Sequence, residues 1–117
     1  MKIEVKGRNV SVTDELRDHV EKRFAKVSRQ VSELARLEVE LSHERNPSNP
    51  AAQVVDATLY LKGATLRARG ASSDFKRSIN LVNDELGPQV KRHREKRRKR
   101  TQTRRAMARL RGRGAES

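Results

Sequence analysis

The last 27 residues of the chain are strongly basic, and they limit where a folded core can lie. Residues 91–117 hold 13 basic and 2 acidic residues, a net charge of +11, whereas residues 1–90 hold 15 basic and 13 acidic residues, a net of +2. A block of like charge repels itself and cannot pack into an apolar interior. The core of this 117-residue chain must therefore come from the first 90 residues or so, which is enough for one domain.

The same basic block predicts a polyanionic partner. A surface that serves only solubility mixes charges of both signs, but residues 91–113 contain a single acid, Glu95. RNA, DNA and an anionic membrane surface are the candidate polyanions. Because Lys and Arg neutralise phosphates and release counterions, such a segment provides affinity without reading base sequence.

Several functional classes are excluded by what the sequence lacks. The chain has no cysteine, so it forms no disulfide and no thiolate metal site, which fits a reducing, cytoplasmic compartment. It has no apolar run of about 18 residues and no secretory signal after Met1, so we expect no membrane span. His19, His43 and His93 lack metal-ligand spacing, and no P-loop, nucleophile elbow or zinc-protease motif occurs. We therefore expect no catalysis, metal, cofactor or small-molecule substrate.

Alternation of polar and apolar residues predicts four strands, over residues 2–6, 37–41, 55–62 and 66–69. Gly63 supplies a tight turn between the last two, which we expect to form a hairpin. Residues 45–50 form a loop by composition.

Two apolar stripes of helical period predict two helices. The first helix is capped by Thr13, and its stripe is Leu16, Val20, Phe24, Val27 and Val31. The stripe of the second helix is Phe75, Ile79, Val82, Leu86 and Val90. Continued at the same period, this stripe becomes basic, at His93, Arg97 and Arg100. Pro88 removes a helical hydrogen bond and disfavours helix at Gly87, so we expect a kink or a break there.

The predicted order is thus β-α-β-β-β-α, an α+β fold in which a four-stranded sheet has two helices packed on one face. The predicted domain covers residues 1–100, with the basic end of the second helix starting at about residue 91. Residues 101–117 form a basic tail that we expect to be disordered until bound.

Several segments in this order resemble the ribosome hibernation promoting factor / ribosome-associated inhibitor (sigma-54 modulation protein) family. They are Lys6-Gly7-Arg8-Asn9-Val10 with Val12–Arg17, then Val39–Glu44, Asp56–Leu59, Asp74-Phe75 with Ile79, and a Lys/Arg-rich helix end. The resemblance implies a cytoplasmic protein that binds 16S rRNA of the small (30S) ribosomal subunit in the mRNA and A/P-site tRNA channel. It implies that translation is blocked by occupancy during stress or stationary phase. The chain resembles a short member, or the N-terminal domain of a long one, and departs from the family at Gly87-Pro88 and Lys76-Arg77.

Two groups of cations are the predicted rRNA-binding residues. The first group, on the outer face of the first helix, is Lys22, Lys26 and Arg29. The second group, on the second helix and its extension, is Lys76, Arg77, Lys91, Arg92, Arg94, Lys96, Arg97, Arg98, Lys99 and Arg100. The first group has an alternative interpretation as an ordinary solvated face, because Asp14, Asp18 and Glu21 share that side. Phe24 and Phe75 belong to apolar stripes, which leaves Tyr60 as the only candidate for stacking on a base.

Two other functions remain open on the sequence alone. The protein could be a general basic RNA-binding protein or nucleic-acid chaperone that acts through residues 101–117. It could also be a protein-interaction module that uses an exposed sheet face, although the outward residues of the predicted strands are mostly polar. For the free protein we expect a monomer.

Overall fold

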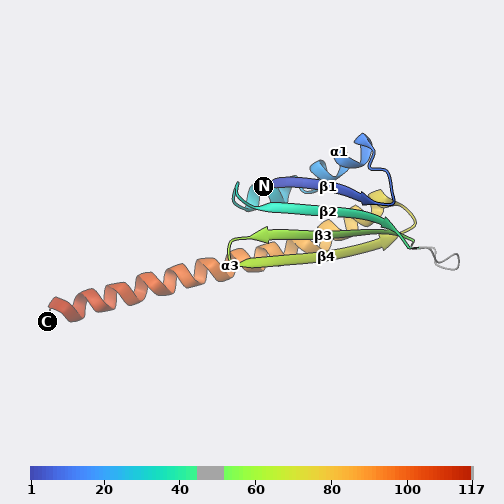
Figure 1. Cartoon of the computed structure of the whole chain (residues 1–117). Helices are drawn as coiled ribbons and strands as arrows, with labels where there is room; N and C mark the ends of the chain where they lie inside the picture. Colours follow the sequence, from blue (N-terminus) through green and yellow to red (C-terminus); the bar gives the residue numbers. More distant parts are fainter. Residues whose placement is uncertain (45–51, 117) are drawn as a thin grey trace.

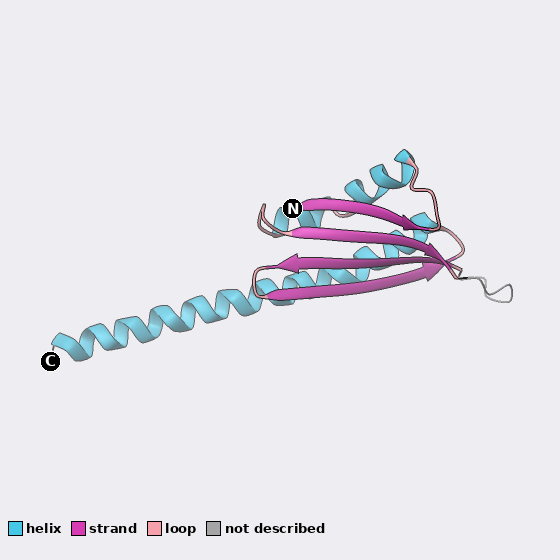
Figure 2. Cartoon of the chain, in the orientation of Figure 1, coloured by secondary structure: helices cyan, strands magenta, loops and turns pink. Residues whose placement is uncertain are grey.

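Four strands form one mixed sheet with the helices on one of its faces (Figure 2). The structure is a computed structural model that describes residues 1–44 and 52–116. Its elements are β1 (Lys2–Arg8), α1 (Asp14–Arg23), α2 (Ala25–Gln30), β2 (Arg36–His43), β3 (Gln53–Leu61), β4 (Ala64–Ser72) and α3 (Phe75–Glu116). The strand order is β1-β2-β3-β4, with β1 parallel to β2 and the other pairs antiparallel. The predicted four-stranded α+β fold is confirmed, and the loop predicted over residues 45–50 lies outside the described residues.

The core lies between the sheet and the helices. In β2, Leu37, Val39 and Leu41 are fully buried and alternate with half-buried Glu38 and Glu40, as the period of a strand requires. The apolar residues of β3 and β4 and the buried stripes of all three helices join them in one cluster. Both predicted helical stripes therefore face the same core.

The first predicted helix is divided in two, which corrects the expectation of a single helix. The Leu16 amide donates to Oγ1 of Thr13 (3.2 Å), so the predicted cap is present. At Phe24 the backbone departs from helical geometry (φ −91°, ψ 9°), and α2 begins at the next residue. Phe24 is fully buried. Tertiary packing of this side chain fixes a backbone conformation that the local composition does not signal.

The second predicted helix is α3, and it is continuous across Gly87-Pro88, which corrects the expected kink or break. Leu86 and Val90 are fully buried on either side of Pro88 and fix the helix to the sheet. Pro88 and Asp84 are both exposed, so water can bind the Asp84 carbonyl that lacks its usual N–H partner. The Gln89 side chain also ties α3 to β4 through a hydrogen bond to the Arg67 carbonyl (2.9 Å).

Residues 101–116 belong to α3, whereas the sequence led us to expect an unstructured tail. Neither Gly nor Pro occurs between Gln89 and Arg111, and the segment is rich in Arg, Lys and Ala, which favour helix. Figure 1 shows α3 passing behind the sheet and continuing beyond its end to the C-terminus. The chain is consequently elongated, with extents of 74 × 27 × 19 Å.

Close packing of α3 on β4 depends on Gly70. A Cβ atom at this position would lie 2.5 Å from the Ser78 carbonyl oxygen and 3.1 Å from side-chain atoms of Leu81 and Val82. Because the first of these neighbours is backbone, it cannot rotate away. Gly70 therefore sets how closely α3 approaches the sheet, and with it the direction in which the basic end of α3 projects.

Candidate nucleic-acid interface

The first group of predicted cations lies on α1 and α2, and the structure brings part of it beside α3. Lys22, Lys26 and Arg29 are all exposed. Lys26 and Lys91 line one groove between α2 and α3, together with Val27, Gln30, Asn83, Asp84, Gly87 and Pro88. Two predicted groups that are 65 residues apart in the sequence thus meet at the surface of the helical layer.

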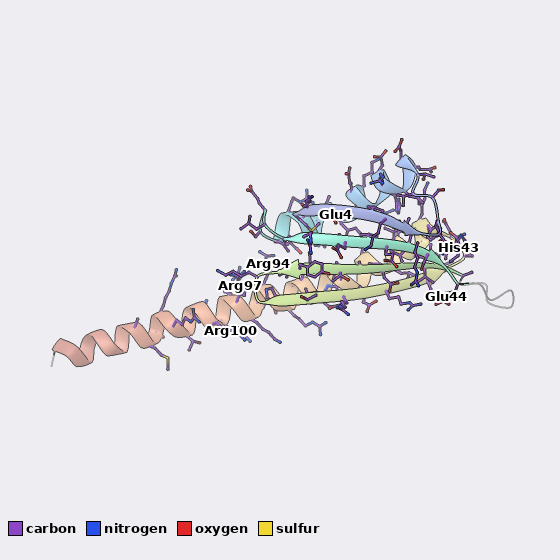
Figure 3. All side chains as sticks on the ribbon, viewed as in Figure 1. Glu4, His43, Glu44, Arg94, Arg97 and Arg100 are labelled. Atoms are coloured by element: carbon purple, nitrogen blue, oxygen red, sulfur yellow. The ribbon has the colours of Figure 1, made fainter. Side chains whose placement is uncertain are left out.

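The largest cluster of cations lies on α3 where this helix leaves the sheet. Val90 is the last fully buried residue of α3 among the side chains that the structure describes, and every residue from Arg94 to Arg100 is exposed. Figure 3 shows Arg94 and Arg97 beside the sheet end and Arg100 further along the projecting helix. The members of the second group in this part of α3 are Lys91, Arg92, Arg94, Lys96, Arg97, Arg98, Lys99 and Arg100.

Up to residue 108, where side-chain placement is described, the helix carries two further exposed cations that the sequence analysis did not include. Arg104 and Arg105 lie on the part of α3 that was expected to be an unstructured tail. A signal for Arg104 was present, because it continues the spacing of His93, Arg97 and Arg100 by four residues. Extending the helical period past Arg100 would have found it.

Lys76 stands apart from the other predicted residues because it forms an ion pair with Glu15 of α1. The hydrogen bond and charge of Lys76 lower the pKa of the Glu15 carboxyl, and Glu15 raises the pKa of Lys76 in the same way. Close by, His19 of α1 and Asn80 of α3 share a hydrogen bond (Nε2 to Oδ1, 2.9 Å). The Lys76 charge is thus partly compensated within the protein, whereas Arg77 beside it is exposed.

The outer face of the sheet carries charges of both signs in contact with one another. The Lys6 Nζ atom lies 3.8 Å from a carboxylate oxygen of Glu40. The guanidinium group of Arg69 lies 3.9 Å from a carboxylate oxygen of Asp56 and 2.5 Å from one of Glu44. In the register row Lys6, Glu40, Asp56 and Arg69, two acidic residues lie between two basic ones. The strands carry six basic and four acidic residues, and α1, α2 and residues 75–90 carry seven basic and six acidic residues. The strongly cationic surface of the described residues is therefore the end of α3 from Lys91 onward.

Tyr60, the one candidate for base stacking, already has a cation on its ring. The Cζ atom of Arg36 lies 4.6 Å from the centroid of the Tyr60 ring, and the Tyr60 hydroxyl donates to Glu38 (3.3 Å). A base could stack on this face only by displacing Arg36.

Among residues 1–44 and 52–116, no group of three or more His, Asp and Glu side chains could hold a metal ion. No helix in the same part of the chain is long and apolar enough to span a membrane.

Fold and charge together define a small α+β domain whose last helix has a strongly cationic end. Residues 3–98 match the model of the family described as Sigma 54 modulation protein / S30EA ribosomal protein, and the chain belongs to this family. The resemblance seen in the sequence is thereby confirmed.

Curated relatives are ribosome hibernation factors. The ribosome hibernation promoting factor of Azotobacter vinelandii is 30% identical over 96 residues, which are 82% of this chain and 85% of the relative. The ribosome hibernation promotion factor of Picosynechococcus is 30% identical over 97 residues, but these are only 50% of that relative. Among solved structures, the N-terminal domain of Thermus thermophilus Protein Y matches with a TM-score of 0.68 and 30% identity, over 80% of this chain and 99% of that domain.

Proposed function

We propose that this protein is a ribosome hibernation factor that binds 16S rRNA of the small (30S) ribosomal subunit. It occupies the mRNA and A/P-site tRNA channel and so silences translation under stress or in stationary phase. The observation that carries the proposal is the family match over residues 3–98, together with relatives that are named ribosome hibernation promoting factors.

Electrostatics supplies the binding mechanism. Phosphates of folded RNA are neutralised by Lys22, Lys26 and Arg29 on one side of the groove and by the cations that begin at Lys91 on the other. Each contact releases counterions, so affinity falls steeply as salt rises. Inhibition by occupancy needs no bond to form or break, which agrees with the lack of catalytic motifs.

Co-sedimentation with purified small subunits at near-physiological salt tests the proposal. We expect the protein to sediment with the subunits and to protect nucleotides of the decoding region from chemical probes. Absence of both effects would overturn the proposal.

A charge-reversal variant tests the assignment of the surface. In the variant Lys91→Glu/Arg92→Glu/Arg94→Glu, affinity for the subunit should fall strongly and its salt dependence should flatten. The matched control reverses three exposed cations on the outer sheet face, Lys2, Arg8 and Arg67, with the same change in net charge. Equal losses in the two variants would show that net charge alone matters, and unchanged binding of the test variant would show that the wrong face was chosen.

A general RNA-binding or chaperone function is the alternative candidate. It is favoured by one observation, the long projecting part of α3, in which residues 94–100 and 102–108 are all exposed. In this alternative, residues 101–117 act as the binding arm and the domain of residues 1–100 is only its support.

A further inference from the structure

An apolar groove opens at the end of the sheet where α3 leaves it. It has a volume of about 490 Å³, which is within the range of small-ligand sites. The α2–β2 connection, the end of β3 and α3 form its walls, and its apolar lining is Val31, Leu34, Ala35, Leu61 and Val90. Leu34, at the edge of the groove, is 94% exposed. Covering this side chain would be favourable, because apolar surface would be removed from water. The groove therefore offers apolar surface that the described residues leave uncovered.

A buried histidine nitrogen and three cations surround this apolar surface. The Nε2 atom of His93 is buried and has no hydrogen-bond partner among the described residues. The charged residues of the lining are all cations, Lys62, Arg94 and Arg97, and none of the lining residues is acidic. Figure 3 shows Arg94 and Arg97 close to the end of the sheet, on the side where α3 emerges.

We propose that this groove receives one unstacked base of the RNA that the protein binds, an inference that rests on the proposed function. A nucleotide has apolar base faces, a hydrogen-bonding base edge and an anionic backbone. The apolar lining matches the first, the polar side chains of Gln30 and Ser32 in the lining match the second, and the cations of the rim match the third. Proteins commonly recognise RNA by bases that are splayed out of the stack in this manner.

The charge of the rim favours RNA over a protein segment as the occupant. Lys62, Arg94 and Arg97 lie at the start of the longer row of cations on α3, so a backbone that leaves the groove meets further positive charge at Arg98 and Arg100. A polynucleotide carries a negative charge at every nucleotide, so its phosphates can pair with cations along the whole row. A peptide with an apolar side chain and one carboxylate would use only the rim.

Leu34→Lys tests the groove, because it removes an apolar contact while it adds a cation. Position 34 is exposed, so folding should be unaffected. If a base occupies the groove, affinity for the small subunit should fall about fivefold or more, because the apolar area that Leu34 buries against the base is lost. Protection of one particular nucleotide from base-specific probes should disappear with it.

Leu81→Lys is the matched control, because Leu81 is also an exposed leucine (42%) and does not line the groove. Its affinity should equal or exceed that of the wild type. If Leu34→Lys also binds as well as the wild type, with every protection retained, the inference is overturned.

Cross-linking identifies the occupant directly. A photoreactive diazirine side chain at position 34 should cross-link to one rRNA nucleotide, whereas a cross-link confined to a ribosomal protein would overturn the inference. If the wild type does not bind subunits at all, the proposed function fails instead. The groove is then tested with a short single-stranded RNA, to which Leu34→Lys should still bind more weakly than Leu81→Lys, and equal binding would overturn the inference.

Discussion

Lys76 of α3 and Glu15 of α1 form an ion pair that joins the two helices on the side where RNA is proposed to bind. Both side chains lie at the surface, so solvent screens the pair and its contribution to folding stability is small. The pair has a larger effect on the affinity for a polyanionic partner, because the Glu15 carboxylate pairs with a cation that could otherwise bind a phosphate. The pair thus moderates the positive charge of this surface.

Glu15→Gln should strengthen binding to small subunits by about fivefold at physiological salt, since it releases one cation for phosphate contact. The slope of log affinity against log salt should become steeper by about one. Titration by co-sedimentation at several salt concentrations measures both. Glu4→Gln, on the outer sheet face (Figure 3), changes net charge equally and should have little effect. Equal gains in both variants would show that net charge alone matters.

The gain from Glu15→Gln should also depend on pH in a defined direction. The pKa of Glu15 is lowered, so its carboxylate persists below the usual range and is lost only as the pH falls through that lowered pKa. The pKa of Lys76 is raised, so its charge persists above the usual range. The difference between variant and wild type should therefore be constant between about pH 5 and 9 and shrink only in stronger acid. A difference that disappears near pH 7 would contradict this assignment.

Deletion of residues 101–117 separates the two candidate functions. The deleted segment carries five of the 28 basic residues, so binding should weaken and its salt dependence should flatten. Because Val90 is the last core residue among the described side chains, the shortened protein should fold, and we expect it still to protect the same decoding-region nucleotides. If the shortened protein no longer binds subunits, the arm is the binding element and the chaperone alternative is correct.

Gly70→Ala should destabilise the fold by about 1–3 kcal/mol, because the added methyl group would meet the Ser78 carbonyl at 2.5 Å and force α3 away from β4. Urea unfolding followed by circular dichroism measures this loss. Gly87→Ala is the control, since a Cβ atom there meets nothing within 4 Å. Its stability should stay within about 1 kcal/mol of the wild type. Similar losses at both positions would contradict the close approach at Gly70.

Pro88→Ala should raise the free energy of unfolding by about 1–3 kcal/mol, because it restores the helical hydrogen bond to the Asp84 carbonyl and removes the clash of the proline ring. Pro88 is exposed, so no buried contact is lost. The same urea titration measures the gain, and a loss of stability would show that Pro88 has a structural role that its surroundings do not reveal.

The periodic parts of this fold were predictable, and the parts set by tertiary packing were not. Alternation and stripes identified every strand and the faces of the helices, since burial imposes those periods directly. The helix break at Phe24 was not predictable, because one buried ring decides it. Pro88 was misleading, since local preference disfavours a helix there while Leu86 and Val90 hold it in place. The cations of the candidate site are visible in the sequence, but the ion pair of Lys76 and the groove beside Leu34 depend on contacts between distant segments.

The projecting part of α3 gives the protein a reach that exceeds the width of its own folded body. From Val90 to Glu116 the helix extends about 39 Å at 1.5 Å per residue, whereas the two shorter extents of the molecule are 27 and 19 Å. A partner that contacts both the groove between α2 and α3 and the far end of α3 must present phosphates tens of ångströms apart. A short oligonucleotide cannot satisfy both places, whereas a large folded RNA can. The length of α3 therefore favours a large folded RNA over a short oligonucleotide as the proposed partner.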